Sequence, residues 1–121
     1  MQMLARNPAA AYRRVALEAR VEASGSADLT RICLEEACAA LGQALIALDR
    51  ASPPPSEALN RAQTIMLWLA QSVASEHPLR DSLKAFYGGL AAQVGANILQ
   101  PRAAELERIR SDIMDLLRAA G

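Results

Sequence analysis

Apolar residues recur every three to four positions along most of the chain, which is the spacing of an amphipathic helix. The clearest case is residues 101–119, where Leu106, Ile109, Ile113 and Leu117 are separated by charged and polar residues. The same period occurs in residues 27–50, 57–76 and 78–99, and no segment alternates as a strand does. The pattern therefore predicts four helices.

Glycine, proline and serine interrupt this pattern at residues 24–26, 52–56, 77–78 and 100–101. We expect Ser26 and Ser56 to cap helices, and Pro78 and Pro101 to occupy first helical positions. The predicted helices are 27–50, 57–76, 78–99 and 101–119. Short connections make neighbouring helices antiparallel. The predicted fold is all-α: an antiparallel four-helix bundle over residues 26–121, preceded by a short cap segment or extra helix over residues 1–25, as one domain.

The period also predicts which side chains face the core. In residues 57–76 we expect the inward stripe to be Leu59, Ala62, Met66, Leu69, Ala70 and Val73. In residues 78–99 we expect it to be Leu79, Leu83, Phe86, Leu90, Val94 and Asn97.

Charge and composition exclude several classes of partner. The chain has 13 basic and 13 acidic residues, so there is no excess positive charge to attract nucleic acid or anionic lipid. No apolar run reaches the roughly 18 residues of a membrane span, and the first residues contain no apolar block typical of a signal peptide. We therefore expect a cytoplasmic protein that binds no nucleic acid and does not insert into membranes.

The sequence contains no arrangement typical of catalysis or metal binding. Cys33 and Cys38 lie five residues apart on one predicted helix, about 140° around it, so we interpret both as packing residues. His77, the single histidine, lies in a predicted turn, and phosphate transfer would require its phosphorylation. Neither phosphate loops nor clustered ligands occur. We expect a protein that is not an enzyme and uses no cofactor or metal.

A surplus of apolar residues distinguishes the second helix. Residues 65–69 are all apolar, although a one-sided helix needs only Met66 and Leu69 to face inward. Trp68 falls about 140° from the centre of the inward stripe. Two interpretations are open: the helix is covered on two sides, or Trp68 is an exposed aromatic at the edge of a binding groove.

Small residues form a similar surplus on the third helix. Gly88, Ala92, Gly95 and Leu99 line up on a side that we expect to lie opposite the core stripe. Each helical glycine costs up to about 1 kcal/mol relative to alanine, so close approach of another helix is the natural compensation. That helix could belong to the same domain or to a bound polypeptide.

Three short phrases occur in order along the chain: YRRV at residues 12–15, LNRAQTI at 59–65 and SLKAFY at 82–87. Together they resemble the FliS family of flagellin export chaperones. The segment at residues 24–26 lacks the family's usual proline. Leu34 and Glu36 occupy positions where the family often has an aromatic or Met and a glycine.

The resemblance implies a cytoplasmic chaperone that binds the C-terminal helical region of flagellin, prevents premature polymerisation and aids delivery to the flagellar export apparatus. It implies that Tyr12 and Val15 plug the groove in the free protein; simple helix packing is the alternative for both. Direct contact with an export-gate component is left open. The candidate client contacts are Leu34, Ile65, Trp68, Gly88, Ala92, Gly95 and Leu99.

A second hypothesis assigns the same apolar surplus to self-association. In that case the protein is a structural or regulatory bundle that forms a homodimer and has no client. The sequence alone fits a monomer or a weak homodimer.

Overall fold

The computed structural model describes residues 26–51, 53 and 55–120. The predicted leader, residues 1–25, lies outside the described residues. The chain divides into two compact units, residues 1–32 and 33–121, so the division falls within the first described helix. The second unit contains the remainder of that helix and the three helices that come after it in the chain.

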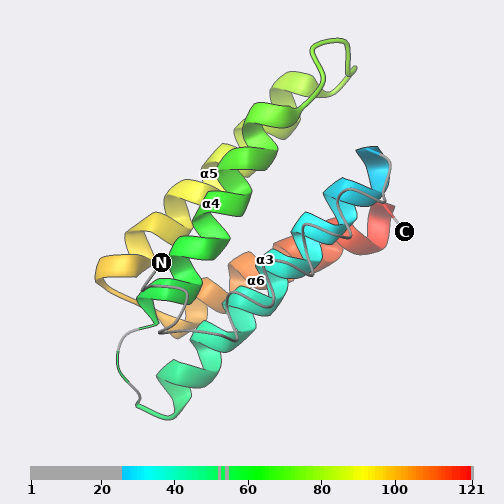
Figure 1. Ribbon diagram of the computed structural model, residues 1–121. Helices are drawn as coiled ribbons and strands as arrows, with labels where there is room; N and C mark the ends of the chain where they lie inside the picture. Colours follow the sequence, from blue (N-terminus) through cyan, green and yellow to red (C-terminus); the bar gives the residue numbers. More distant parts are fainter. Residues whose placement is uncertain (1–25, 52, 54, 121) are drawn as a thin grey trace, which may run out of the picture. The chain divides into compact units, whose positions relative to one another are not determined.

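Four helices make up the described chain, and the prediction of an all-α antiparallel bundle is confirmed. Figure 1 shows α4 and α5 running side by side in opposite directions. α6 lies beside α3, because Cys38 Sγ is 4.0 Å from the carbonyl oxygen of Arg110. The helices are α3 (Ser26–Asp49), α4 (Ser56–Ser72), α5 (Arg80–Leu99) and α6 (Ala103–Ala120).

Side chains from all four helices form the core, and aliphatic residues dominate it. Ala37, Ala40 and Ala44 are fully buried on α3, where small residues permit close helix packing. The larger buried side chains are Leu34, Leu41, Leu59, Met66, Leu69, Leu90, Val94, Leu106, Ile109 and Ile113. The inward stripe expected on α4 is confirmed at Leu59, Ala62, Met66 and Leu69, while Ala70 and Val73 are half-buried.

The stripe predicted for α5 is wrong by one position at its aromatic residues. Tyr87 is buried, whereas Phe86 is exposed and meets the Tyr87 ring edge-on with centroids 5.9 Å apart. Tyr87 precedes Leu90, Ala91 and Val94 by three, four and seven residues, which places it in their row; Phe86 is about 100° away. Burial raises the pKa of the Tyr87 hydroxyl.

The connection between α4 and α5 is longer than predicted. α4 ends at Ser72, where the Ser72 hydroxyl donates to the Leu69 carbonyl, and Val73 is extended with ψ 127°. α5 begins at Arg80 instead of Pro78, and Leu79, expected in the core, is an exposed N-cap residue. Serine's competition for a helical carbonyl and the β-branched valine both favour ending α4 early.

Helix ends also differ from the predicted caps. Ser56 is the first helical residue of α4, and Pro55 precedes it without a side-chain cap. At the end of α3, Ala51 has φ 50° and its N–H donates to the Leu48 carbonyl. This left-handed conformation, which usually selects glycine, terminates the helix.

Asn97 joins the end of α5 to the start of α6. Its amide is buried, and Oδ1 accepts from the Arg102 N–H at 2.7 Å. Nδ2 donates to the Gln93 carbonyl at 2.9 Å and to Glu105 Oε1 at 3.2 Å. Asn97 therefore caps α6 from the preceding helix, so α6 begins at Ala103, two residues after Pro101.

We expect Asn97→Ala to destabilise the bundle by about 1–3 kcal/mol, because it removes a buried, hydrogen-bonded amide and the acceptor of the Arg102 N–H. Urea denaturation followed by circular dichroism would measure this loss. Gln93→Ala, which keeps the backbone carbonyl that Asn97 uses, is the control and should change stability little. An unchanged free energy of unfolding in Asn97→Ala would contradict the capping role.

Glu105 should give the junction a dependence on pH. Hydrogen bonds from Asn97 and Arg102 lower the pKa of its carboxyl group below the usual value. A carboxylate with a lowered folded-state pKa stabilises the fold above its unfolded pKa of about 4.3. That contribution is lost as pH falls through the folded-state pKa.

Wild type should therefore be more stable than Glu105→Gln at neutral pH, and the difference should vanish in acid. Thermal unfolding of both proteins over a pH series would measure it. A difference that is constant with pH would contradict the assignment.

Candidate functional site

The surface of interest lies on the α4–α5 hairpin, and one side chain fixes how these helices face each other. Gln63 of α4 donates from Nε2 to the Ala91 carbonyl of α5 at 3.3 Å. A Cβ atom added to Gly95 would collide with the same amide nitrogen. Glycine at position 95 thus allows the Gln63 amide to lie against the backbone of α5. The close neighbour is a side chain of α4 and not the helix backbone that the sequence suggested.

Arg61 marks the opposite side of α4, which faces α3. Its Nη2 donates to Gln43 Oε1 at 2.9 Å, and its Nε lies 3.6 Å from Glu36 Oε1. Gln63 and Arg61 are about 160° apart around α4 by angular spacing. The two contacts therefore define an α5-facing side and an α3-facing side of this helix.

Large apolar side chains are exposed further along both sides. Trp68 follows Arg61 by seven residues and so lies on the α3-facing side, where its exposed fraction is 43%. Leu67 follows Gln63 by four residues on the α5-facing side and is 46% exposed. The exposure of Trp68 is as expected for one of the two interpretations, whereas its place at the edge of a binding groove stays a prediction.

Leu67, however, was missed. The run of five apolar residues at 65–69 contained the signal, because an amphipathic helix cannot bury all five. Leu67, and not Trp68, lies on the side of α4 nearest the small residues of α5.

The structure separates the remaining candidate contacts by burial. Ala92 and Leu99 are exposed, the latter by 93%, and Ile65, Gly88 and Gly95 are half-buried. Tyr12 and Val15 lie outside the described residues.

Two expectations are corrected. Leu34 is only 1% exposed, because its position on α3 belongs to the core row of Ala37 and Leu41, so it is not a surface contact in this structure. The small residues do not all lie opposite the core: Gly95 packs against Gln63, on the flank of α5 that faces α4.

The exposed surface of the hairpin is free of charge over much of its length. No Asp, Glu, Lys or Arg occurs in residues 62–75 or 85–101. On α6, by contrast, exposed positions include Glu107, Arg108, Asp115 and Arg118. Charge depletion combined with exposed aromatic and aliphatic groups is typical of the centre of a protein interface.

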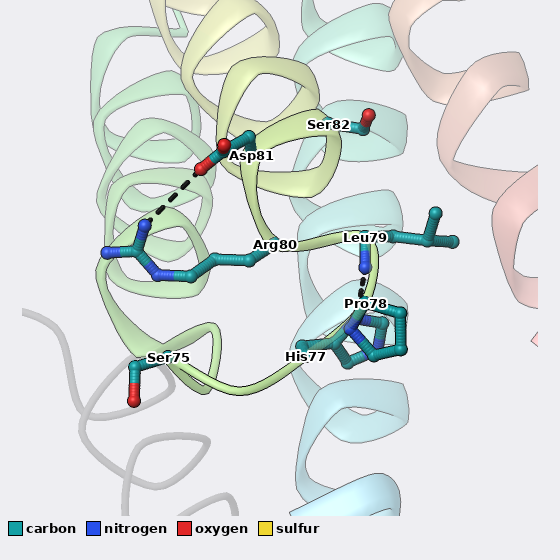
Figure 2. A pocket seen from close by; sticks show the side chains of 7 residues that line it. All are labelled: Ser75, His77, Pro78, Leu79, Arg80, Asp81 and Ser82. Atoms are coloured by element: carbon teal, nitrogen blue, oxygen red, sulfur yellow. Dashed lines mark hydrogen bonds and ion pairs between the residues drawn. The ribbon is translucent and has the colours of Figure 1, made fainter.

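A separate hollow of about 280 Å³ lies at the tip of the hairpin (Figure 2). His77 Nδ1 accepts from the Leu79 N–H at 3.0 Å, and Arg80 pairs with Asp81 at 3.3 Å. The His77 ring and the Arg80–Asp81 pair are thus both engaged in local contacts of the turn. The hollow is lined by Ser75, His77, Pro78, Leu79, Arg80, Asp81 and Ser82.

The two cysteines are buried free thiols, as the prediction of packing residues requires. Burial, and then the Glu36 charge, raise the pKa of Cys33. Burial also raises the pKa of Cys38, a change that the Arg110 charge partly offsets and Glu35 reinforces. Both thiols should therefore react slowly, because the thiolate is the reactive form.

Within the described residues, no group of three or more histidine, cysteine or acidic side chains could hold a metal ion. No helix in that part of the chain has the length and apolar character to cross a membrane. Comparison with known protein families, curated proteins and solved structures finds no significant match for the chain.

The glycines of α5 should respond differently to substitution. A Cβ added to Gly89 meets nothing within 4 Å, so Gly89→Ala should stabilise the fold by up to about 1 kcal/mol through helix propensity. Gly95→Ala must displace the Gln63 amide, so the same substitution there should increase the free energy of unfolding by less, or not at all.

Urea denaturation at low micromolar protein concentration would measure the free energy of unfolding of both variants. In a Gln63→Ala background, Gly95→Ala should increase stability as Gly89→Ala does in wild type. A loss of stability in Gly89→Ala would show that an internal contact requires this glycine.

Proposed function

We propose that the protein is a non-enzymatic cytoplasmic export chaperone, similar to the FliS family, that binds the C-terminal helical region of flagellin. The observation that carries the proposal is the exposed Trp68 on an uncharged stretch of α4. The all-α bundle and the three FliS-like phrases support it.

The α3-facing side of α4 offers an amphipathic helix an apolar surface beside a polar one. Arg61 is tied to α3 by Glu36 and Gln43, while Trp68 is exposed two turns further along the same side. Half-buried Ile65 lies between them. A client helix seated there would cover the indole ring and keep the guanidinium group at the edge of the contact.

The physical role of such a surface is to mask a segment that would otherwise self-assemble. A flagellin tail that polymerises through its own apolar face cannot do so while that face covers Trp68. Folding of a disordered client on binding consumes part of the interaction free energy, which keeps the complex reversible.

The second candidate, a self-associating bundle, is favoured by a different observation: the apolar outer side of α5, where Leu99 is 93% exposed. The two functions use different sides of the hairpin and can therefore be tested separately.

Calorimetric titration with a peptide covering the C-terminal helical region of flagellin from the same organism tests the proposal. We expect saturable one-to-one binding with a negative heat-capacity change, weakened at least about tenfold in Trp68→Glu. Ser111→Glu, which adds the same charge at an exposed position of α6, is the matched control and should bind as wild type does.

Binding that is equal in Trp68→Glu and wild type would leave the chaperone function and exclude Trp68 as its contact. No binding of wild type at high micromolar concentration would overturn the chaperone proposal.

A further inference from the structure

The outward side of α5 carries a row of residues that no described part of the chain covers. Its members are spaced four, three, four and three residues apart, which places them along one side of the helix. All five are exposed, and Leu99, the last of them, is the most exposed large apolar residue in the part of the chain that the structure describes. We call this row the outer stripe: Ala85, Gly89, Ala92, Ala96 and Leu99.

Leu67 extends the apolar surface from the stripe onto α4. It lies on the side of α4 that Gln63 turns toward α5, and nearly half of its surface is exposed. The stripe and Leu67 therefore form one surface across two helices, within segments that contain no charged residue. A solvated surface of this extent would normally carry charges, as α6 does.

The paired glycines point to a helix backbone as the occupant. Gly88 and Gly89 each have open space where a Cβ would stand, so no close contact within the described chain requires them. Each costs up to about 1 kcal/mol relative to alanine in a helix. A helix that packs on the outer stripe could approach the α5 backbone closely at these glycines, because no side chain keeps it away.

We propose that the occupant is the outer stripe of a second copy, packed antiparallel about a two-fold axis near Ala92. The stripe is self-complementary in size: Leu99 lies seven residues after Ala92, and Ala85 lies seven residues before it. The two-fold axis places Leu99 of each copy against Ala85 of the other, so a large side chain meets a small one at both ends. It places the glycine pair against Gly95 and Ala96, where the two backbones can approach closely.

Charge also selects this pairing. Exposed positions of α6 carry acidic and basic groups, so packing the stripe on α6 would bury charges without partners. The outer stripe meets no charge when it packs on itself. The formal net charge of zero adds no overall repulsion between copies.

The size of the surface sets the strength of the dimer. A 20-residue helix is about 30 Å long, and two adjacent helices are about 20 Å wide, which gives roughly 600 Å² per copy. This is below the ~800 Å² per partner of a standard interface, so we expect a weak dimer that dissociates on dilution. The inference rests on this chain alone and is independent of the client's identity.

Sedimentation velocity from low to high micromolar concentration tests the dimer. Wild type should shift from monomer to dimer over that range, whereas Ala92→Glu, which places two like charges at the axis, should remain monomeric. Ser111→Glu is the matched control and should dimerise as wild type does. Circular dichroism of Ala92→Glu, whose altered residue is exposed, checks that its fold is retained.

Oxidative cross-linking tests the geometry. Ala92→Cys should form a disulfide-linked homodimer, and a mixture of Ala85→Cys with Leu99→Cys should cross-link more than either variant alone. Ser111→Cys should cross-link poorly, and wild type should not cross-link because both native thiols are buried.

A wild type that stays monomeric at high micromolar concentration would overturn the proposal. So would a dimer that persists in Ala92→Glu and cross-links through Ser111→Cys, because its interface would lie elsewhere. A monomer whose flagellin binding is lost in Ala92→Glu would assign the outer stripe to the client instead.

Discussion

The contact between Gln63 and Gly95 fixes which surfaces of the hairpin face the solvent. The Gln63 amide lies against the α5 backbone and donates to Ala91, and together with the buried rows of both helices this contact sets the rotation of each helix about its axis. Leu67 and Trp68, adjacent in sequence, are then directed to different sides of α4. The outer stripe of α5 is left uncovered as a consequence of the same rotation. Both proposed interactions depend on this one polar contact inside an apolar hairpin.

Asn97 has a comparable role at the other end of α5, where a buried amide replaces a local cap. Its three hydrogen bonds satisfy the amide and the N–H group of Arg102, the residue that precedes α6. A buried polar group is costly unless it is fully bonded, so this arrangement favours one geometry of the connection over others. The uncharged C-terminal part of α5 thereby stays attached to the charged α6 in a defined register.

Periodicity predicted the fold class and most of the core of α4 and α6, because the inward positions of both helices recur every three to four residues. It was wrong at the start of α5, where Phe86 and Tyr87 are both aromatic and the pattern does not decide between them. A helix that is apolar around most of its circumference gives no unique inward direction. The angle of Trp68 placed it away from the core row, but it did not decide between coverage by a second neighbour and exposure to solvent. The packing of Gly95 against Gln63 was not, because it depends on a side chain from another helix.

The surplus apolar surface of α5 follows from a conflict between stability and association. Alanine at position 89 would favour the helix, and charged residues at positions 85, 92 and 96 would favour solvation; the chain has neither. A protein that worked only as an isolated bundle would gain from both changes. Retaining small, uncharged residues along the outer stripe lowers the stability of the monomer and leaves space for another backbone. The loss of monomer stability is therefore offset when a second copy covers the outer stripe. Because we expect this contact to be weak, the stripe would remain exposed in part of the molecules.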